Sequence, residues 1–156
     1  MFFVKDDLLL LALNWFYLLE LTQVDFYLTQ AKYSEDKYNT LVLLEMADNE
    51  TVHANKIKGY IEHMGGFPTK IGKYLSHASK YIAKLTNYTT TANFFYVNYI
   101  IESIAFSDYK KIIKAIEPEN TFKKEMLNGL IKNLIDEDEH RNWFLGTRRS
   151  LQKKGN

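Results

Sequence analysis

The sequence has no cysteine, and only two prolines and seven glycines occur among its 156 residues. Without cysteine the chain can form no disulfide, thiolate metal site, thiol redox centre or rubredoxin-type iron site. The scarcity of proline and glycine, in a chain rich in Leu, Ile, Lys, Glu and Tyr, favours long helices. An excess of one charge is also lacking, because the formal net charge is +1, so we expect no nucleic-acid partner. We predict one all-α domain over residues 1–156.

The one long apolar region, residues 2–21, is not an uninterrupted hydrophobic run. Three charged residues at positions 5–7 precede its centre, Asn14 and Glu20 interrupt it, and no small-residue cleavage site follows. These features are unlike those of a signal peptide or a membrane span. We interpret the region as a buried helix and expect the protein to be cytoplasmic.

Apolar residues recur at helical spacing through most of the chain, and turn signals divide it into four helices. Ser34 or Asp36 is expected to cap the second helix, and two glycines at 65–66 followed by Pro68 should end it. Threonines at 89–91 offer caps for the third helix. The predicted helices run from about Asp6 to Lys32, from Lys37 to Met64, from residues 89–91 to Ile116, and from Phe122 to Gln152.

The connection between the second and third helices, Thr69 to Tyr88, is too long for a tight turn. Apolar residues at helical spacing suggest that part of it is helical. Such a connection suits a crossover along the length of a bundle, as in ferritin-like topologies. We therefore predict a ferritin-like four-helix bundle, in which two antiparallel hairpins are joined by a long, partly helical crossover.

Two copies of a Glu-x-x-His motif stand in the second and fourth predicted helices, at Glu50–His53 and Glu137–His140. Residues three apart share a helix face, so each motif presents a carboxylate beside an imidazole. Glu20 and Glu102 stand alone in apolar stretches of the first and third helices, where an unpaired carboxylate would cost several kcal/mol. A Glu from each of two helices plus Glu-x-x-His from the other two is the ligand set of di-iron and di-manganese carboxylate bundles.

Distances from the predicted turns place these residues level with one another. Glu20 and Glu50 each lie about 15 residues from the first turn, and Glu102 and Glu137 each lie about 17 or 18 residues from the second. Equal distances from the turn of an antiparallel hairpin mean equal heights along the bundle. The four carboxylates are also the predicted catalytic residues. We predict a metal site with six ligands: Glu20, Glu50, His53, Glu102, Glu137 and His140.

Carboxylate oxygens combined with imidazole nitrogens suit two iron ions, with manganese or a mixed Mn/Fe pair as alternatives. Two metals that share Glu20 or Glu102 as a bridge would leave open positions for oxygen or peroxide. Asp136 and Asn49 directly precede the ligating Glu residues of the two motifs. Each of them either orients a His of the other helix or is a plain surface residue.

Tyr27, two turns after Glu20, is interpreted as a core residue, with a redox-active phenol beside the metals as the alternative. Glu45, His63 and His77 lie off the converging set and are predicted not to be ligands.

Three stretches carry a resemblance to a known family: Glu20-Leu21-x-x-Val24-Asp25-x-Tyr27; Glu50-x-x-His53-Ala54 with Gly66 and Pro68 downstream; and Asp136-Glu137-Asp138-x-His140-x-x-Trp143. They resemble the ferritin-like superfamily, and most closely bacterioferritin, over about three quarters of the chain. The resemblance implies a four-helix bundle with a di-iron centre held by the six residues named above.

Departures from the family narrow the expected function. Bacterioferritins carry an axial haem-ligating Met where Thr51 stands, so we expect no haem. The sequence ends at Asn156, before the fifth helix that helps build ferritin cages, which argues against a storage shell. Rubrerythrins add a further carboxylate in the third helix and usually a Cys-rich domain, both missing here. Tyr27 and Gln30 also resemble demethoxyubiquinone hydroxylases, which have further membrane-associated helices.

Three functions remain open. The first is a di-iron oxidoreductase that reacts with oxygen or hydrogen peroxide as a ferroxidase, peroxide scavenger or hydroxylase, with an unknown electron donor or organic substrate. The second is iron storage in an assembled shell. The third is a metal-stabilised interaction module without activity. In addition, Phe2, Phe3 and Leu8 to Leu10 are expected to be exposed and to form a homodimer contact.

Overall fold

The computed structural model of the chain describes residues 6–69 and 91–154. These residues form four helices and no strand: α1 (Asp6–Tyr33), α2 (Lys37–His63), α4 (Thr91–Ala115) and α5 (Thr121–Lys154). The all-α prediction is confirmed for this part of the chain, with each helix close to its expected position. The predicted crossover over 69–88 lies outside the described residues, apart from Thr69.

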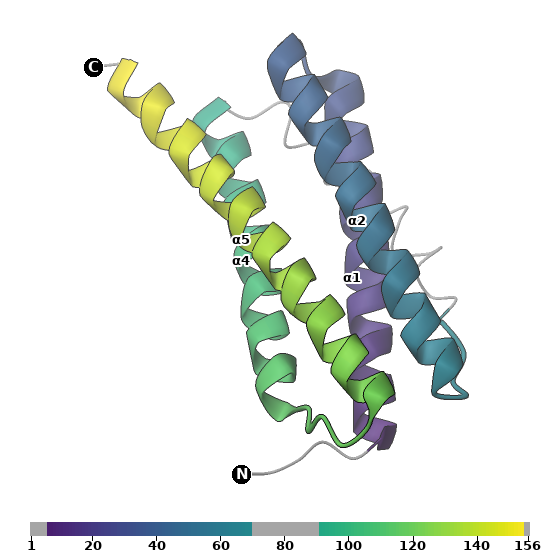
Figure 1. Ribbon diagram of the computed structural model, residues 1–156. Helices are drawn as coiled ribbons and strands as arrows, with labels where there is room; N and C mark the ends of the chain where they lie inside the picture. Colours follow the sequence, from purple (N-terminus) through teal and green to yellow (C-terminus); the bar gives the residue numbers. More distant parts are fainter. Residues whose placement is uncertain (1–5, 70–90, 155–156) are drawn as a thin grey trace.

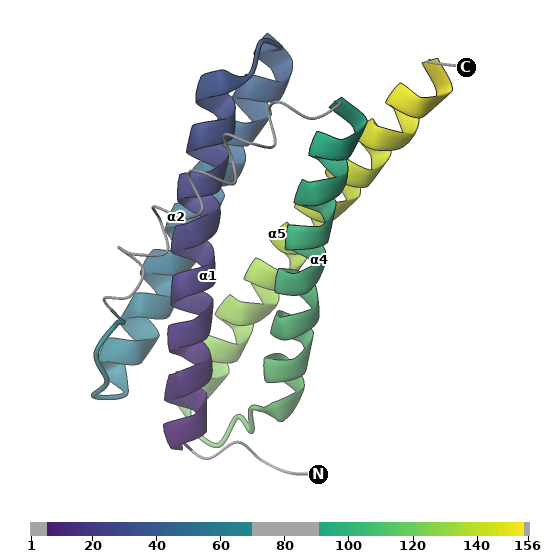
Figure 2. The ribbon, with the colours of Figure 1, turned by 180° about the vertical axis from the view of Figure 1, so that it is seen from behind.

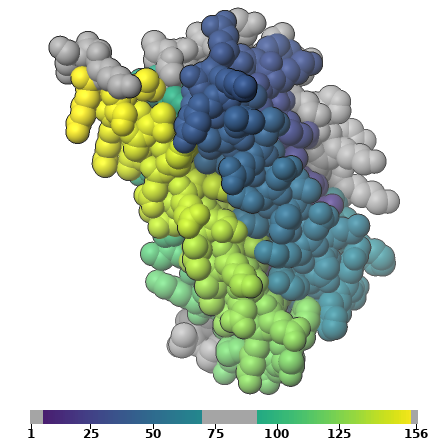
Figure 3. Space-filling view, turned by 45° about the horizontal axis from the view of Figure 1, so that its top comes forward, coloured from purple at the N-terminus to yellow at the C-terminus, as the bar shows by residue number. Residues whose placement is uncertain are grey.

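The helices pair as two antiparallel hairpins, α1 with α2 and α4 with α5, that lie against each other as a four-helix bundle (Figure 1). α1 and α5 run in one direction along the bundle, and α2 and α4 run in the other. α2 and α5 share one face (Figure 3), while α1 and α4 share the opposite one (Figure 2). The end of α2 and the start of α4 therefore lie at opposite ends of the bundle.

The helix ends follow the predicted turn chemistry. Asp36 caps α2, because its side chain accepts a hydrogen bond of 2.7 Å from the backbone N–H of Asn39. After α2 the chain turns at Gly65, whose φ of +77° is strained for other residues. The backbone N–H of Gly66 then donates to the carbonyl of Ile61 at 2.9 Å, which satisfies an orphan group of the helix end.

The apolar core is divided into two clusters by a polar layer. In every helix the sequence passes from one cluster, through buried polar residues, into the other, so the polar layer lies at mid-height. The first cluster comprises Leu9, Leu13, Phe16, Ile57, Ile61, Tyr109, Ile112, Ile116, Met126 and Leu130. The second comprises Phe26, Tyr27, Ala31, Leu43, Met46, Ala47, Phe94, Phe95 and Phe144.

The expected exposed face at the start of α1 needs correction. Leu8 is 57 % exposed, but Leu9 is 1 % exposed and belongs to the first cluster, since adjacent helical residues point in different directions. Phe2 and Phe3 lie outside the described residues, and the homodimer stays a prediction. By length and composition, α1 is the one described helix that could cross a membrane, a test that core helices of soluble proteins also meet.

Close approach of α2 and α5 generates a stability prediction. A methyl group added at Gly129 would overlap the hydroxyl of Tyr60, whereas Gly146 on the same helix faces open space. We expect Gly129→Ala to give a free energy of unfolding about 1–3 kcal/mol below that of Gly146→Ala, because the Tyr60 ring must move to make room for the methyl group. Gly146→Ala should raise the free energy of unfolding by about 0.5–1 kcal/mol, because alanine is the better helix former. Urea unfolding followed by circular dichroism measures both. Equal stabilisation by the two changes would contradict the close approach.

Candidate metal centre

All six predicted ligands lie buried in the polar layer, and each helix contributes at least one of them. α1 and α4 provide one Glu each, while α2 and α5 each provide a Glu and a His one turn apart. The exposed fractions are 0 % for Glu20, Glu50, Glu102 and Glu137, 1 % for His53 and 5 % for His140. The helical registers expected from the turns therefore bring these side chains to one level.

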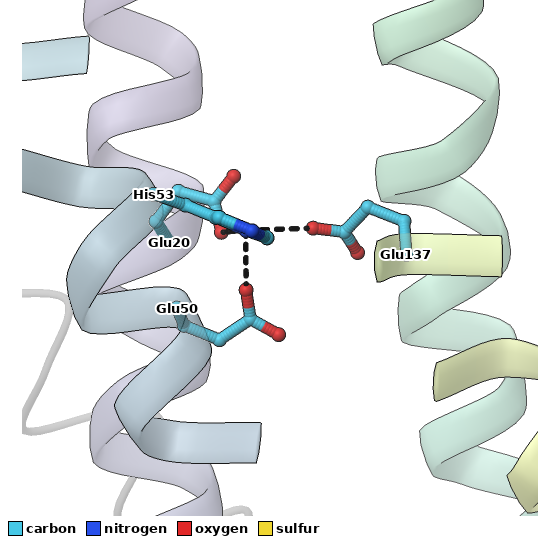
Figure 4. Close-up of side chains that lie close together, drawn as sticks. All are labelled: Glu20, Glu50, His53 and Glu137. Atoms are coloured by element: carbon cyan, nitrogen blue, oxygen red, sulfur yellow. Dashed lines mark ion pairs between the residues drawn. The ribbon is translucent and has the colours of Figure 1, made fainter. Parts of the chain in front are cut away.

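The first group of side chains surrounds the imidazole of His53 (Figure 4). Its Nδ1 lies 2.9 Å from Glu50 Oε2, 3.5 Å from Glu137 Oε1 and 3.7 Å from Glu20 Oε2. Three helices, α1, α2 and α5, thus direct three carboxylates at one imidazole nitrogen. One ligand atom from each of these four residues lies within 4.8 Å of all the others, so the group could hold a metal ion.

The second group surrounds His140 and overlaps the first. His140 Nδ1 lies 3.0 Å from Glu50 Oε1 and 3.7 Å from Glu102 Oε1, and Glu137 completes the group. The two groups share Glu50 and Glu137. The expectation that Glu20 or Glu102 is shared is therefore wrong in this geometry. The shared carboxylates come from the Glu-x-x-His helices, because α2 and α5 lie against each other along the bundle.

The unsatisfied atoms of this layer test whether a metal fits. Several buried polar atoms of this layer make no hydrogen bond to any described residue. They are Glu20 Oε2, both carboxylate oxygens of Glu50 and of Glu137, and the Nδ1 atoms of His53 and His140. Buried polar atoms are otherwise nearly always hydrogen-bonded. These atoms are oxygen and nitrogen donors that converge in two overlapping groups. Each of the two groups therefore has a donor set that could hold a metal ion.

The Nε2 atom of each imidazole contacts a side chain of the opposite hairpin. His53 Nε2 lies 3.0 Å from Asp136 Oδ2, and His140 Nε2 lies 3.3 Å from the amide nitrogen of Asn49. The sequence left open whether Asp136 and Asn49 orient a His of the other helix or are plain surface residues, and the geometry supports the first alternative. A carboxylate only accepts, so Asp136 holds the proton of His53 on Nε2 and leaves Nδ1 free for a metal. An amide can donate or accept, so Asn49 does not fix the tautomer of His140.

Two tyrosines hold the carboxylates that the two groups do not share. The Tyr27 hydroxyl donates to Glu102, and the Tyr109 hydroxyl donates to Glu20, so each bond joins one hairpin to the other. Tyr27 is thus both a fully buried core residue and a neighbour of the candidate metal centre. Tyr109 was missed by the sequence reasoning. It follows Glu102 by seven residues, as Tyr27 follows Glu20, and this repeated spacing is the signal that could have identified it.

Two amides complete the hydrogen bonding and were also missed. Gln23 Nε2 donates to Glu102 Oε2 at 3.3 Å, and Asn133 Nδ2 donates to the Tyr109 hydroxyl at 3.1 Å. Both side chains are buried. They precede or follow a predicted ligand by one helical turn, but such spacing alone is too common to single them out.

Crowding of acids in an apolar interior shifts their proton affinities. Burial, reinforced by the neighbouring charges of Glu50 and Glu20, raises the pKa of Glu137 to about 8. Burial likewise raises the pKa of Glu50 and of Glu102 well above the usual range for carboxyl groups. For His53, burial lowers the pKa, but the surrounding carboxylates outweigh burial and raise it well above its usual value. Without a metal, the layer therefore retains protons at neutral pH.

Residues predicted not to be ligands lie away from this layer where they are described. Glu45 is exposed, and the exposed ring of His63 stacks on Phe122 with 3.9 Å between ring centroids. His77 lies outside the described residues. Thr51 is exposed and donates to the backbone carbonyl of Ala47 at 2.8 Å, so its side chain is engaged with its own helix.

The retained protons make the stability of the metal-free protein depend on pH. Glu137 has a folded-state pKa of about 8, against about 4.3 in an unfolded chain. Between these values the folded state binds the extra proton, so stability falls as pH rises. The raised pKa of His53 acts in the same direction above its unfolded value of about 6.5. In EDTA, we expect the urea midpoint to fall between about pH 5 and pH 8.

The control for this measurement is a matched pair of substitutions on buried and exposed glutamates. Glu137→Gln removes the titrating group and should flatten the pH dependence, whereas Glu45→Gln, at an exposed position, should leave it unchanged. A midpoint that stays level or rises over this range in the unsubstituted protein would contradict the assigned shifts.

No protein-family model matches the sequence, and no curated protein matches it. A functional assignment therefore depends on the geometry of the polar layer itself.

Proposed function

We propose that this chain is a ferritin-like di-metal carboxylate protein that acts as a non-haem di-iron oxidoreductase on oxygen or hydrogen peroxide. One observation carries the proposal: two overlapping groups of buried carboxylates and imidazoles, each able to hold a metal ion, lie at the centre of the bundle. His53 Nδ1 and His140 Nδ1 lie at ion-pair distance from Glu50. Within the described part of the chain, however, neither these nitrogens nor the Glu50 and Glu137 oxygens make a hydrogen bond, which is costly in a protein interior.

The arrangement of the helices supports the ferritin-like part of the proposal. α2 and α4 run in the same direction, so the segment that joins them has to span the length of the bundle (Figure 1). One long connection of this kind is typical of ferritin-like folds, in which two helices supply a Glu and two supply Glu-x-x-His. The distribution of the six side chains over α1, α2, α4 and α5 matches that scheme.

The ligands divide naturally between two ions. Glu20 and His53 would hold one, Glu102 and His140 the other, and Glu50 and Glu137 would lie between them. Mixed oxygen and imidazole donors suit iron or manganese. Bound iron would supply electrons and Lewis acidity for a reaction with oxygen or peroxide.

The chain's own residues prepare this site in three ways. Tyr27 and Tyr109 hold Glu102 and Glu20 in place by hydrogen bonds from the opposite hairpin. The apolar clusters on both sides of the layer keep bulk water away. The protons retained by Glu137 and its neighbours must leave when a metal binds, because ligands bind in their deprotonated forms. Metal affinity should consequently rise with pH.

Anaerobic titration with Fe(II), followed by exposure to air, tests the proposal. We expect two Fe(II) ions per chain and a rapid absorbance increase in the near ultraviolet as they are oxidised. Glu50→Ala removes a carboxylate that both groups share and should abolish the rapid phase. Glu45→Ala, at an exposed position of the same helix, is the matched control and should behave as the unsubstituted chain does. Absence of stoichiometric binding, or equal behaviour of the two variants, would refute the proposal.

A second prediction concerns the hydrogen-bond partners of the two imidazoles, which are a carboxylate for His53 and an amide for His140. Asp136 fixes the metal-binding tautomer of His53, whereas Asn49 leaves that of His140 open, so the His53 group should bind the first ion. In a Co(II) titration followed by visible absorption, Asp136→Asn should weaken the tighter step by about 10–100-fold. Asn49→Asp should instead strengthen the weaker step. Two equal steps in the unsubstituted chain, unaffected by either change, would contradict this ranking.

A further inference from the structure

A cavity of about 260 Å³ opens between α1 and α4 beside the polar layer. α1 packs mainly against α2, and α4 mainly against α5, while α1 and α4 lie side by side on one face of the bundle with few close backbone contacts (Figure 2). The cavity has a buried floor, where Gln23 is 1 % and Phe26 is 3 % exposed. Its rim is open, with Trp15 48 % and Ile104 49 % exposed. This hollow therefore connects solvent with the interior at the height of the candidate metal centre.

The lining of the cavity selects for a neutral, apolar occupant. The described residues that line it include no charged side chain, and the apolar ones are Trp15, Leu19, Phe26, Ile101 and Ile104. Of its two polar members, Thr22 donates to the backbone carbonyl of Leu18 at 2.8 Å. A charged ligand would lose its hydration here without gaining a partner. An apolar cavity of about 150 Å³ accommodates benzene, so this larger one has room for a molecule of about two rings.

Gln23 links the cavity to the candidate metal centre. Its side chain lines the cavity, and its Nε2 donates to Glu102 Oε2 at 3.3 Å. Among the described residues, no hydrogen-bond partner meets Gln23 Oε1, although this atom is buried. Because Oε1 is buried, an occupant of the cavity does not reach it, and the surface offered to the occupant is apolar. The link between the cavity and Glu102 is therefore the position of the Gln23 side chain, not a hydrogen bond to the occupant.

One residue of the rim, Trp15, also contacts α4 outside the cavity. The indole N–H of Trp15 donates to Asp108 Oδ2 at 3.3 Å, which ties the ring to α4. We propose that this cavity binds a small, neutral and largely apolar organic molecule, about two rings in size, as the substrate class of the adjacent metal centre. The binding site follows from the cavity alone, while its role as a substrate site depends on the proposed function.

The test is a calorimetric titration of the metal-free, full-length chain with 2-naphthol, which has the stated size and chemistry. We expect saturable binding of one molecule per chain. Ile104→Trp places a larger ring at the rim and should weaken binding by at least about tenfold. Ile100→Trp is the matched control, since Ile100 is 40 % exposed, lies one turn earlier on α4 and does not line the cavity. Absent binding, or equal binding by both variants, overturns the proposal.

Two further measurements separate the alternatives. Sedimentation equilibrium tests whether a second copy of the chain covers the cavity instead; a dimer that Ile104→Trp dissociates, together with no binding of 2-naphthol, overturns the proposal. In the Co(II)-loaded chain, 2-naphthol should change the visible spectrum through Gln23 and Glu102. Binding without that change overturns the substrate role. If Co(II) does not bind at all, the metal proposal fails, while the titration of the metal-free chain still decides the cavity.

Discussion

Four carboxylates buried at one level of the bundle are the constraint around which the rest of the structure is arranged. Charges in an apolar interior are costly unless they are neutralised, paired or bound to a cation. Each helix therefore changes from apolar to polar and back to apolar at the height of this layer, and the core is split into two clusters. The pKa values of Glu50, Glu102 and Glu137 are raised for the same reason, because burial disfavours the charged form of each carboxyl group.

The two hairpins are joined through this layer by contacts that cross from one to the other. Tyr27 reaches Glu102, Tyr109 reaches Glu20, and His53 reaches Asp136. The repeated spacing gives the site an approximate two-fold symmetry, but its halves are not equivalent. Gln23 follows Glu20 by three residues, whereas the corresponding position after Glu102 is the small apolar Ala105. The two groups of side chains that could each hold a metal ion are therefore chemically unequal.

Different residues of α1 lie in three different environments. It contributes Leu9, Leu13 and Phe16 to the first cluster, Glu20 to the candidate metal centre, and one wall to the cavity. This explains why the helix is apolar enough to resemble a membrane span and yet has polar residues that are fully buried. Apolar residues at the cavity rim, such as Trp15, are exposed because neither hairpin covers the α1–α4 seam.

Local sequence determined the helices, their caps and the six converging side chains, because helical periodicity, turn residues and distance from a turn fix register within each hairpin. The sequence left open whether Asp136 and Asn49 contact a His or are plain surface residues, and the structure places each beside a His of the opposite hairpin. Only the tertiary structure decided how the hairpins face each other. That docking makes Glu50 and Glu137 the shared carboxylates, brings Tyr109 to Glu20, and opens the cavity beside Gln23. These features depend on contacts between residues far apart in the chain. Spacing along a single helix does not predict such contacts.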